Sequence, residues 1–185
     1  MVILIVGKTC SGKDTVAHHI AERYGFHRIV TYTTRPMRAD DVQGVSHHFI
    51  TVEERKQYSD EELFSPTEIA GYEYFMLKSQ FLSGDVVCIV DPKGVEDVKA
   101  LGVEYGVIYV EAPEAMILCR AEERGTNINV VMERLNAERN RFDSYRDSAT
   151  YNYRINNIQT VRALKIKVDS CMACFGYSPY EKEAI

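Results

Sequence analysis

The sequence predicts an α/β fold with three layers, in which helices cover both faces of a parallel sheet. Three continuous apolar runs, typical of strands buried on both faces, stand at residues 2–6, 86–90 and 106–111. Segments with the apolar periodicity of helices follow these runs at residues 13–24, 92–101 and 114–124. This alternation of strand and helix is the pattern of α/β proteins, whose ligands bind at the carboxyl ends of the strands.

Composition limits the class of protein. A chain of 185 residues fits one domain. Its formal net charge of −5 argues against general nucleic-acid binding, which needs a basic surface to displace counterions from the phosphate backbone. The first apolar run is too short to cross a membrane, so we expect a cytoplasmic protein with no membrane partner. The odd number of scattered cysteines is typical of reduced thiols, and we expect no structural disulfide among Cys10, Cys88, Cys119, Cys171 and Cys174.

A phosphate-binding loop is predicted between the first strand and the first helix. The spacing from Gly7 to Gly12 and Lys13 is that of a P-loop, whose glycines and backbone N–H groups wrap around nucleotide phosphates. The position after the lysine is normally Ser or Thr, but here it is Asp14, a carboxylate better suited to holding metal-bound water. The residues assigned to the loop and its phosphates are Gly7, Lys8, Thr9, Cys10, Ser11, Gly12, Lys13, Asp14 and Thr15.

The segment after the first helix contains the second group of candidate residues. The helix is expected to end at Gly25, and a short strand over residues 26–31 follows. This strand leads to a run of hydroxyl side chains with Arg35 and Arg38, whose guanidinium groups suit a phosphate monoester. Residues 49–76 break into short acidic pieces, which fits an insert into the core.

The run from Thr33 to Arg38, followed by Asp41, Gly44, His47 and Phe49, resembles the acceptor signature of the guanylate kinase family. The resemblance continues through residues 71–74, Asp91 and residues 120–126 to Asn156, and it covers about residues 1–157. It implies one domain, residues 1–185, with a P-loop NTPase-type parallel-sheet core. The implied parts are the core (1–31, 77–120 and 147–170), a monophosphate-binding insert (32–76), a helical lid (121–146) and a tail (171–185).

The same resemblance implies a nucleoside monophosphate kinase that uses ATP and Mg²⁺, with GMP or dGMP as the first candidate acceptor and a monomeric or homodimeric state. It assigns catalysis to Lys13, Arg35, Arg120, Arg124 and Arg134. It assigns the acceptor to Thr31, Thr34, Arg35, Arg38, His47, Ser65, Glu68, Tyr74 and Asp91. Asn156 joins the loop residues that bind ATP, and the metal is assigned to Asp14, Thr15 and Asp91.

The sequence departs from the family where the base is recognised. Thr31 replaces a serine, His47 replaces a tyrosine that bonds the acceptor phosphate, and Ser65 replaces the glutamate that reads guanine. Met76 and Ile89 replace a serine and an aspartate. Fewer polar contacts to the base predict a relaxed or changed base preference. Glu68 would substitute only after a register shift, because alternation along a strand puts it on the face opposite Ser65, and His47 would bind phosphate better at mildly acid pH.

The C-terminal part is predicted to contribute a lid and a closing element. Residues 127–146 form an amphipathic basic helix, on which we expect Arg139 and Arg141 to be surface residues. Residues 159–168 are expected to form a helix or strand against the core, and residues 169–185 show no clear pattern. Cys171 and Cys174 form a lone C-x-x-C pair, which is more typical of ordinary thiols than of a zinc site.

Two other functions remain open from the sequence. Ribose bisphosphate phosphokinases resemble guanylate kinases and also carry Gly-Lys-Asp in the P-loop, but that family lacks so complete a segment as Asp41 to Phe49. A catalytically silent guanylate-kinase-like binding module is the second alternative, although such modules have typically lost the lysine that is present here as Lys13.

Overall fold

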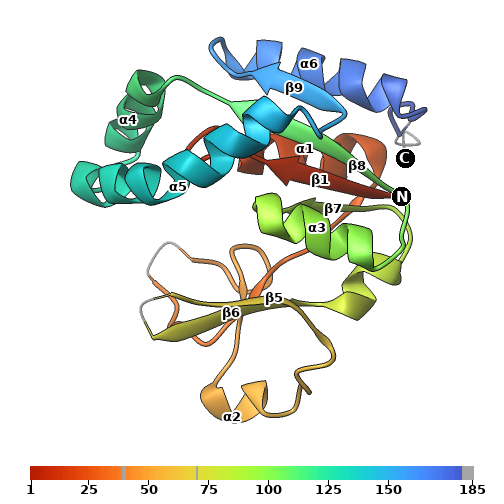
Figure 1. Cartoon of the computed structure of the whole chain (residues 1–185), viewed down its shortest axis with the longest axis vertical. Coiled ribbons are helices and arrows are strands. Elements are labelled where there is room, and N and C mark those ends of the chain that lie inside the picture. Colours follow the sequence, from red (N-terminus) through yellow and green to blue (C-terminus); the bar gives the residue numbers. More distant parts are fainter. Residues whose placement is uncertain (39–40, 70, 181–185) are drawn as a thin grey trace, which may run out of the picture.

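A five-stranded parallel sheet forms the core in the computed structural model, which describes residues 1–38, 41–69 and 71–180 (Figure 1). The strands are ordered β2 (His27–Arg28), β7 (Val86–Ile89), β1 (Val2–Val6), β8 (Tyr105–Glu111) and β9 (Tyr153–Asn156). Each neighbouring pair is parallel. β1 lies in the middle and is entirely buried. The predicted parallel α/β fold is therefore confirmed.

Helices cover both faces of this sheet because alternate side chains of β1 point in opposite directions. Ile3 and Ile5 pack in one cluster with residues of α1 (Lys13–Tyr24) and α6 (Val161–Cys174). Leu4 and Val6 pack in another with residues of α3 (Pro92–Ala100) and α5 (Ile128–Ser148). Figure 1 shows α6 at one end of the molecule and α3 on the side that faces the second sheet.

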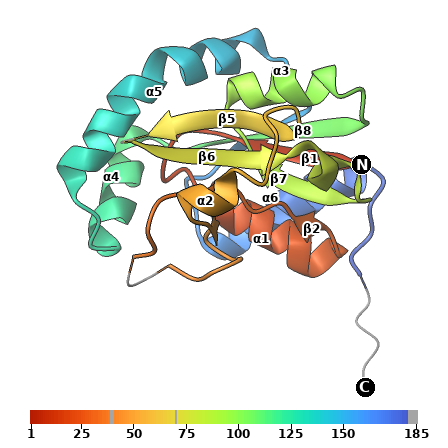
Figure 2. The same ribbon diagram turned by 90° about the horizontal axis from the view of Figure 1, so that it is seen from below.

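The second sheet is built entirely from residues 32–77. Its four strands are ordered β4 (His48–Phe49), β3 (Tyr32–Thr33), β6 (Tyr72–Leu77) and β5 (Leu63–Ile69), with α2 (Val52–Arg55) beyond them (Figures 1 and 2). Phe64, Met76 and Phe81 connect this sheet to the core cluster that contains Val90 at the end of β7. The short 3₁₀ helix η1 (Lys78–Leu82) leads the chain back into the core. The sheet is thus fixed next to the carboxyl end of β7.

A third cluster joins α4 (Glu114–Glu123) to the first turns of α5. It contains Ile117, Ala121, Val131 and Leu135. Both helices extend to one side of the core, as Figures 1 and 2 show. Among the helices of residues 1–38, 41–69 and 71–180, none is both long and apolar enough to cross a membrane.

Several predicted elements change in detail. The first helix has the predicted bounds and ends at Gly25, which adopts a left-handed conformation with φ 72°. The strand predicted over residues 26–31 is only His27–Arg28, because the chain then leaves the core for the second sheet. The last element is a helix, and it continues through residues 169–174, for which the sequence showed no pattern. Residues 181–185 of the expected tail lie outside the described residues.

All five cysteines carry free thiols. Cys171 is buried against the core on α6, whereas Cys174 is exposed one turn later. Burial raises the pKa of the Cys171 thiol to about 11. Cys171 therefore serves as a packing residue.

Candidate active site

The predicted phosphate loop turns sharply between β1 and α1, and two of its glycines are required by the space around them. A Cβ atom at Gly7 would lie 2.1 Å from the carbonyl oxygen of Val110. Gly12 has φ 104°, and a Cβ there would lie 2.4 Å from Nδ2 of Asn157. Cys10 adopts a left-handed conformation with φ 52° although it is not glycine. The loop is therefore held in one tight conformation by its neighbours.

Asn157 supports this loop from the end of β9, one residue beyond the predicted Asn156. Its Nδ2 donates to the carbonyl oxygen of Ser11 at 2.8 Å, and its own carbonyl oxygen accepts from Nη2 of Arg120 at 2.9 Å. The Nη1 of Arg120 is buried and has no hydrogen-bond partner within the described part of the chain. Asn156 is instead exposed and borders a cavity with Lys8. Sequence reasoning missed Asn157 because a one-residue difference in strand end decides which side chain faces the loop.

Lys13 lies inside the loop, where its Nζ donates to the carbonyl oxygen of Lys8 at 2.6 Å. Burial lowers the pKa of Lys13, while the carboxylates of Glu138 and Asp14 act in the opposite direction. Glu138 comes from α5, and its Oε2 accepts from the backbone N–H of Thr9 at 2.7 Å. A carboxylate of α5 thus binds a backbone N–H of the loop that is predicted to bind phosphate. Lys8 pairs with Asp143 of the same helix at 2.8 Å.

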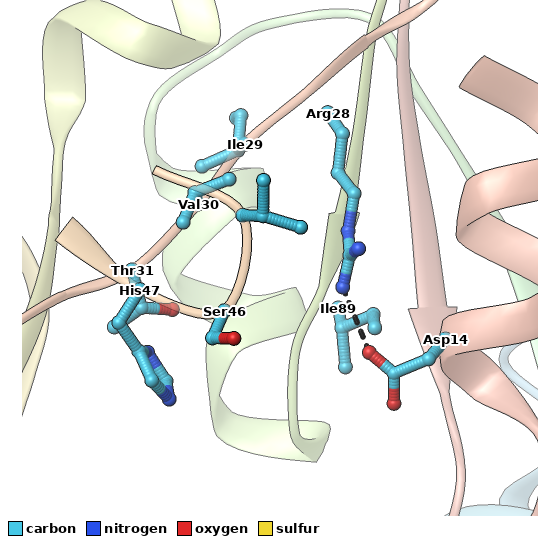
Figure 3. A pocket seen from close by; sticks show the side chains of 9 residues that line it. Asp14, Arg28, Ile29, Val30, Thr31, Ser46, His47 and Ile89 are labelled. Atoms are coloured by element: carbon cyan, nitrogen blue, oxygen red, sulfur yellow. Dashed lines mark hydrogen bonds and ion pairs between the residues drawn. The ribbon is translucent and has the colours of Figure 1, made fainter. Parts of the chain in front are cut away.

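Asp14 extends from the first turn of α1 toward Arg28 on β2, and the two form an ion pair with 2.7 Å between Oδ1 and Nη2 (Figure 3). The Asp14 side chain is 81% exposed. Thr15, the next residue, is half-buried. The described residues contain no cluster of three or more His, Cys, Asp or Glu side chains arranged for a metal ion. Any Mg²⁺ here would therefore need ligands from a substrate as well.

The predicted phosphate-binding arginines lie on the second sheet's side of the site. Arg35 is buried, pairs with Asp41 at 2.8 Å, donates to the carbonyl oxygen of Pro36 and stacks over Phe49. The hydrogen bond from the backbone N–H of Arg38 and the Arg35 guanidinium lower the pKa of Asp41. Asp41 thus fixes the direction of Arg35.

Arginine side chains from the segment after β3 and from α5 line a cavity of about 590 Å³. Its walls include Arg35 and Arg38 on one side. On the other side they include Arg134, Glu138 and Arg141 of α5. Arg134 is exposed and lines this cavity, whereas Arg124 is an exposed residue at the end of α4 and lines none of the cavities described here. Three of the five arginines assigned from the sequence are therefore brought together.

Arg141 is a surface residue as expected, with its side chain 51% exposed, and the same side chain also reaches Asp91 at the start of α3. Its Nη1 donates to Oδ2 of Asp91 at 2.7 Å. Asp91 also begins α3 as its N-cap, where Oδ1 accepts from the backbone N–H of Gly94 at 2.8 Å. Arg139 is indeed a surface residue, paired with Glu114. The sequence signal for Arg141 is its position three residues after Glu138, which puts both side chains on one face of α5.

His47 lies where three cavities meet. Its ring makes edge contacts with Phe49 and Tyr74, and its buried Nδ1 has no partner in the described part of the chain. Burial and the nearby Arg35 guanidinium lower the pKa of His47 below its ordinary value of 6.5. The predicted gain in phosphate affinity on protonation of His47 is therefore expected at a lower pH, because burial and the Arg35 guanidinium disfavour the charged ring.

A second cavity of about 390 Å³ lies between the second sheet and the end of β7. Thr31, Ser65, Tyr74 and Asp91, four of the residues assigned to the acceptor from the sequence, all line it. Its apolar lining consists of Ile69, Phe75, Met76, Ile89 and Val90. Thr34 does not line it; the Thr34 hydroxyl accepts from the backbone N–H of Glu73 at 2.9 Å and holds β3 against β6.

A β-bulge decides which side chains of β5 reach this cavity. The pairing of β5 with β6 shifts between Phe64 and Thr67, and Ser65 within the bulge has φ 49°. Thr67 is paired with Tyr74 and lines the cavity, whereas Glu68 is paired with Glu73 on the other face of the hairpin. A register shift does occur at the bulge, but Glu68 stays on the face opposite Ser65, as alternation predicts, and Thr67 lines the cavity beside Ser65.

Comparisons with known proteins agree with this arrangement. The family model described as guanylate kinase matches residues 1–172. A guanylate kinase of Symbiobacterium thermophilum is 28% identical over 172 residues, which cover 89% of this chain and 81% of that protein. A guanylate kinase of Salinibacter ruber is 28% identical over 135 residues, covering 68% and 71%. The crystal structure of guanylate kinase from Anaplasma phagocytophilum has a TM-score of 0.64 at 18% identity, covers 94% of this chain and 85% of its own, and supports the fold.

Proposed function

The chain belongs to the guanylate kinase family and is a nucleoside monophosphate kinase, and from this premise we propose its reaction in more detail. It transfers the γ-phosphoryl group of ATP, in the presence of Mg²⁺, to a nucleoside or deoxynucleoside monophosphate, with GMP and dGMP as the first candidates. The observation that supports this best is the cavity in which Arg35, Arg38 and Arg134 converge beside the phosphate loop.

Phosphoryl transfer depends mainly on positioning and on cations that stabilise the charge of the transferred group. In this proposal Lys13 and the loop N–H groups bind the donor phosphates. Arg120 lies next to the loop through Asn157, and its unpartnered Nη1 is available for a phosphate oxygen. Arg134 closes onto the transferred group from α5.

Arg35 and Arg38 hold the acceptor phosphate on the opposite side. Asp41 and the carbonyl oxygen of Pro36 already fix the Arg35 guanidinium, so little freedom is lost when a phosphate binds. The face of His47 adds a polar ring next to the same cavity. This arrangement would hold the two substrates in line without a covalent intermediate.

Guanylate kinases generally use Mg²⁺, which neutralises charge on the donor phosphates. Asp14 fits this ion because its exposed carboxylate stands at the start of α1, beside the phosphate loop. Thr15 follows it on the helix. Asp91 fits less well, because its two oxygens accept from Gly94 and Arg141. We therefore assign Mg²⁺ to Asp14 and the donor phosphates, and assign Asp91 to the acceptor side.

The apolar cavity favours a base over a bare sugar phosphate as part of the acceptor. Ile69 and Ile89, with Met76 behind them, offer apolar surface for a planar ring, which ribose bisphosphate lacks. The cavity has one carboxylate, Asp91, and its oxygens already accept from Arg141 and Gly94. Apart from the side chains of His47, Tyr74, Lys93 and Arg141, the other polar groups of the lining are the hydroxyls of Thr31, Ser65 and Thr67. A hydroxyl makes one bond where a carboxylate accepts two from guanine, so base discrimination should be weaker than in a site with a free carboxylate.

A substrate panel tests this proposal. GMP, dGMP, AMP, dTMP, dCMP and ribose 1,5-bisphosphate would each be assayed with ATP and Mg²⁺ for ADP release, at one pH and one Mg²⁺ concentration. We expect turnover of nucleoside monophosphates, with base preferences in kcat/KM below roughly ten-thousandfold. Turnover of the sugar bisphosphate alone would refute the acceptor class, and a GMP preference above that limit would refute the relaxed base site.

A further inference from the structure

Asp14 creates an electrostatic problem for a loop that binds phosphate. The N-terminus of α1 attracts anions through its free N–H groups and its dipole, and the donor phosphates of the proposed function bind at this end. The Asp14 carboxylate stands in the first turn of the same helix, next to Lys13. It directly follows Lys13 in the first turn of α1, so its charge lies near any phosphate that Lys13 binds. A hydroxyl in this position would add no such charge.

Arg28 supplies the opposite charge. It lies on the edge strand β2, where its backbone pairs with Val87, and its guanidinium reaches Asp14 at 2.7 Å. The Arg28 side chain is 27% exposed, so the pair is partly shielded from water on the Arg28 side. Within the described residues, the Arg28 guanidinium is the cation that contacts Asp14.

The pair also stands where the two substrates would meet. Asp14 and Arg28 line a cavity of about 290 Å³ together with Thr31 and His47, and the latter two also line the larger apolar cavity. Figure 3 shows Arg28 and Asp14 on one wall of this cavity and Thr31, Ser46 and His47 on the other. The charge of the pair therefore acts on the junction between donor and acceptor.

We propose that Arg28 is a positioning residue of the donor site. It neutralises the charge of Asp14, so that the phosphate loop has the same net charge as a P-loop with Ser or Thr after its lysine. This inference rests on the proposed use of ATP as donor. Arg28 acts through Asp14 and has no contact with the nucleotide. The loss of Arg28 should therefore harm nucleotide binding only while Asp14 keeps its charge.

A double-mutant cycle tests this prediction. Binding of a fluorescent ADP analogue would be measured without metal and with Mg²⁺ in the wild type, Arg28→Met, Asp14→Asn and the double variant. We expect Arg28→Met to weaken binding by about tenfold, the order of magnitude for one uncompensated charge near the phosphates. Without metal, Asp14→Asn alone should tighten binding, because the charge of Arg28 is then uncompensated, and the double variant should return to within about threefold of the wild type. The titrations with Mg²⁺ report separately on the metal role proposed for Asp14. The defect of Arg28→Met should shrink at high salt.

Arg23→Met is the matched control. Arg23 lies at the other end of α1, where it forms an ion pair with Asp169 of α6. Thermal melting of each variant would separate unfolding from weaker binding. Unchanged binding in Arg28→Met would overturn the inference, since the pair would then be a surface contact only. A double variant as weak as Arg28→Met would also overturn it, because Arg28 would then contact phosphate directly. A wild type that fails to bind ADP would instead refute the proposed function, and the inference with it.

Discussion

The carboxylate of Glu138 binds a backbone N–H of the loop that a donor phosphate is expected to bind. Replacing Glu138 with glutamine should therefore make nucleotide binding tighter. Its carboxylate accepts from the backbone N–H of Thr9 at 2.7 Å and acts on the ammonium group of Lys13. A phosphate that enters the loop needs the same donors. Nucleotide binding must then break this contact, and its free energy is subtracted from the affinity.

The size of the effect follows from the kind of hydrogen bond. A hydrogen bond to a charged group contributes about 1.5–3 kcal/mol net, and a neutral one about 1 kcal/mol. Glutamine keeps the shape and can still accept from Thr9, but it loses the charge. The penalty should fall by about 1 kcal/mol, which corresponds to roughly fivefold tighter binding of ADP.

Isothermal titration of ADP into the wild type and Glu138→Gln would measure this difference. Glu133→Gln is the matched control, because Glu133 is an exposed residue of the same helix, α5, and the chemical change is identical. We expect unchanged affinity in the control. Equal or weaker ADP binding in Glu138→Gln would show that the carboxylate does not compete with phosphate, and the reasoning would be refuted.

Three further predictions concern the proposed site. Lys13→Ala should lower kcat by at least about a hundredfold while the melting temperature stays near that of the wild type; near-normal turnover would contradict the phosphate-loop assignment. Arg35→Ala should raise the KM of the acceptor far more than that of ATP, with poor rescue by lysine, whereas equal changes would assign Arg35 to the donor side or the scaffold. For His47, the unfolded chain takes up its proton near pH 6.5 and the folded chain only at lower pH, so stability should fall as pH drops through 6.5. Urea unfolding at several pH values should show a weaker fall in His47→Gln, and an unchanged fall would exclude His47 as a cause.

The sequence was sufficient where a local pattern determines the structure. β1, the loop and α1 follow from an apolar run, glycine spacing and helical periodicity, and the bounds of α1 agree with the prediction. The sequence also indicated three of the arginines that line the 590 Å³ cavity, Arg35, Arg38 and Arg134. Arg35 and Arg38 could be recognised because they stand in a compact motif.

The sequence was insufficient where contacts depend on tertiary geometry. Arg28 contacts Asp14 from the strand β2, and Glu138 contacts Thr9 from the helix α5. No local sequence pattern predicts either contact. Asn157 contacts the loop, and the predicted Asn156 does not, because periodicity cannot locate the end of a strand to one residue. Thr67 lines the cavity although the sequence indicated no role for it, because the irregular pairing of β5 with β6 is not visible in a local pattern.

The helix α5 touches both halves of the site at once, through Glu138 on the loop and Arg141 on Asp91, one turn apart. If the helix moves as a rigid body, a donor that displaces Glu138 also loosens the contact of Arg141, and an acceptor that displaces Arg141 loosens that of Glu138. The two binding sites would then share a coupling free energy, and linkage requires each substrate to raise the affinity of the other by the same factor. ADP titrated with and without a saturating monophosphate would give that factor directly.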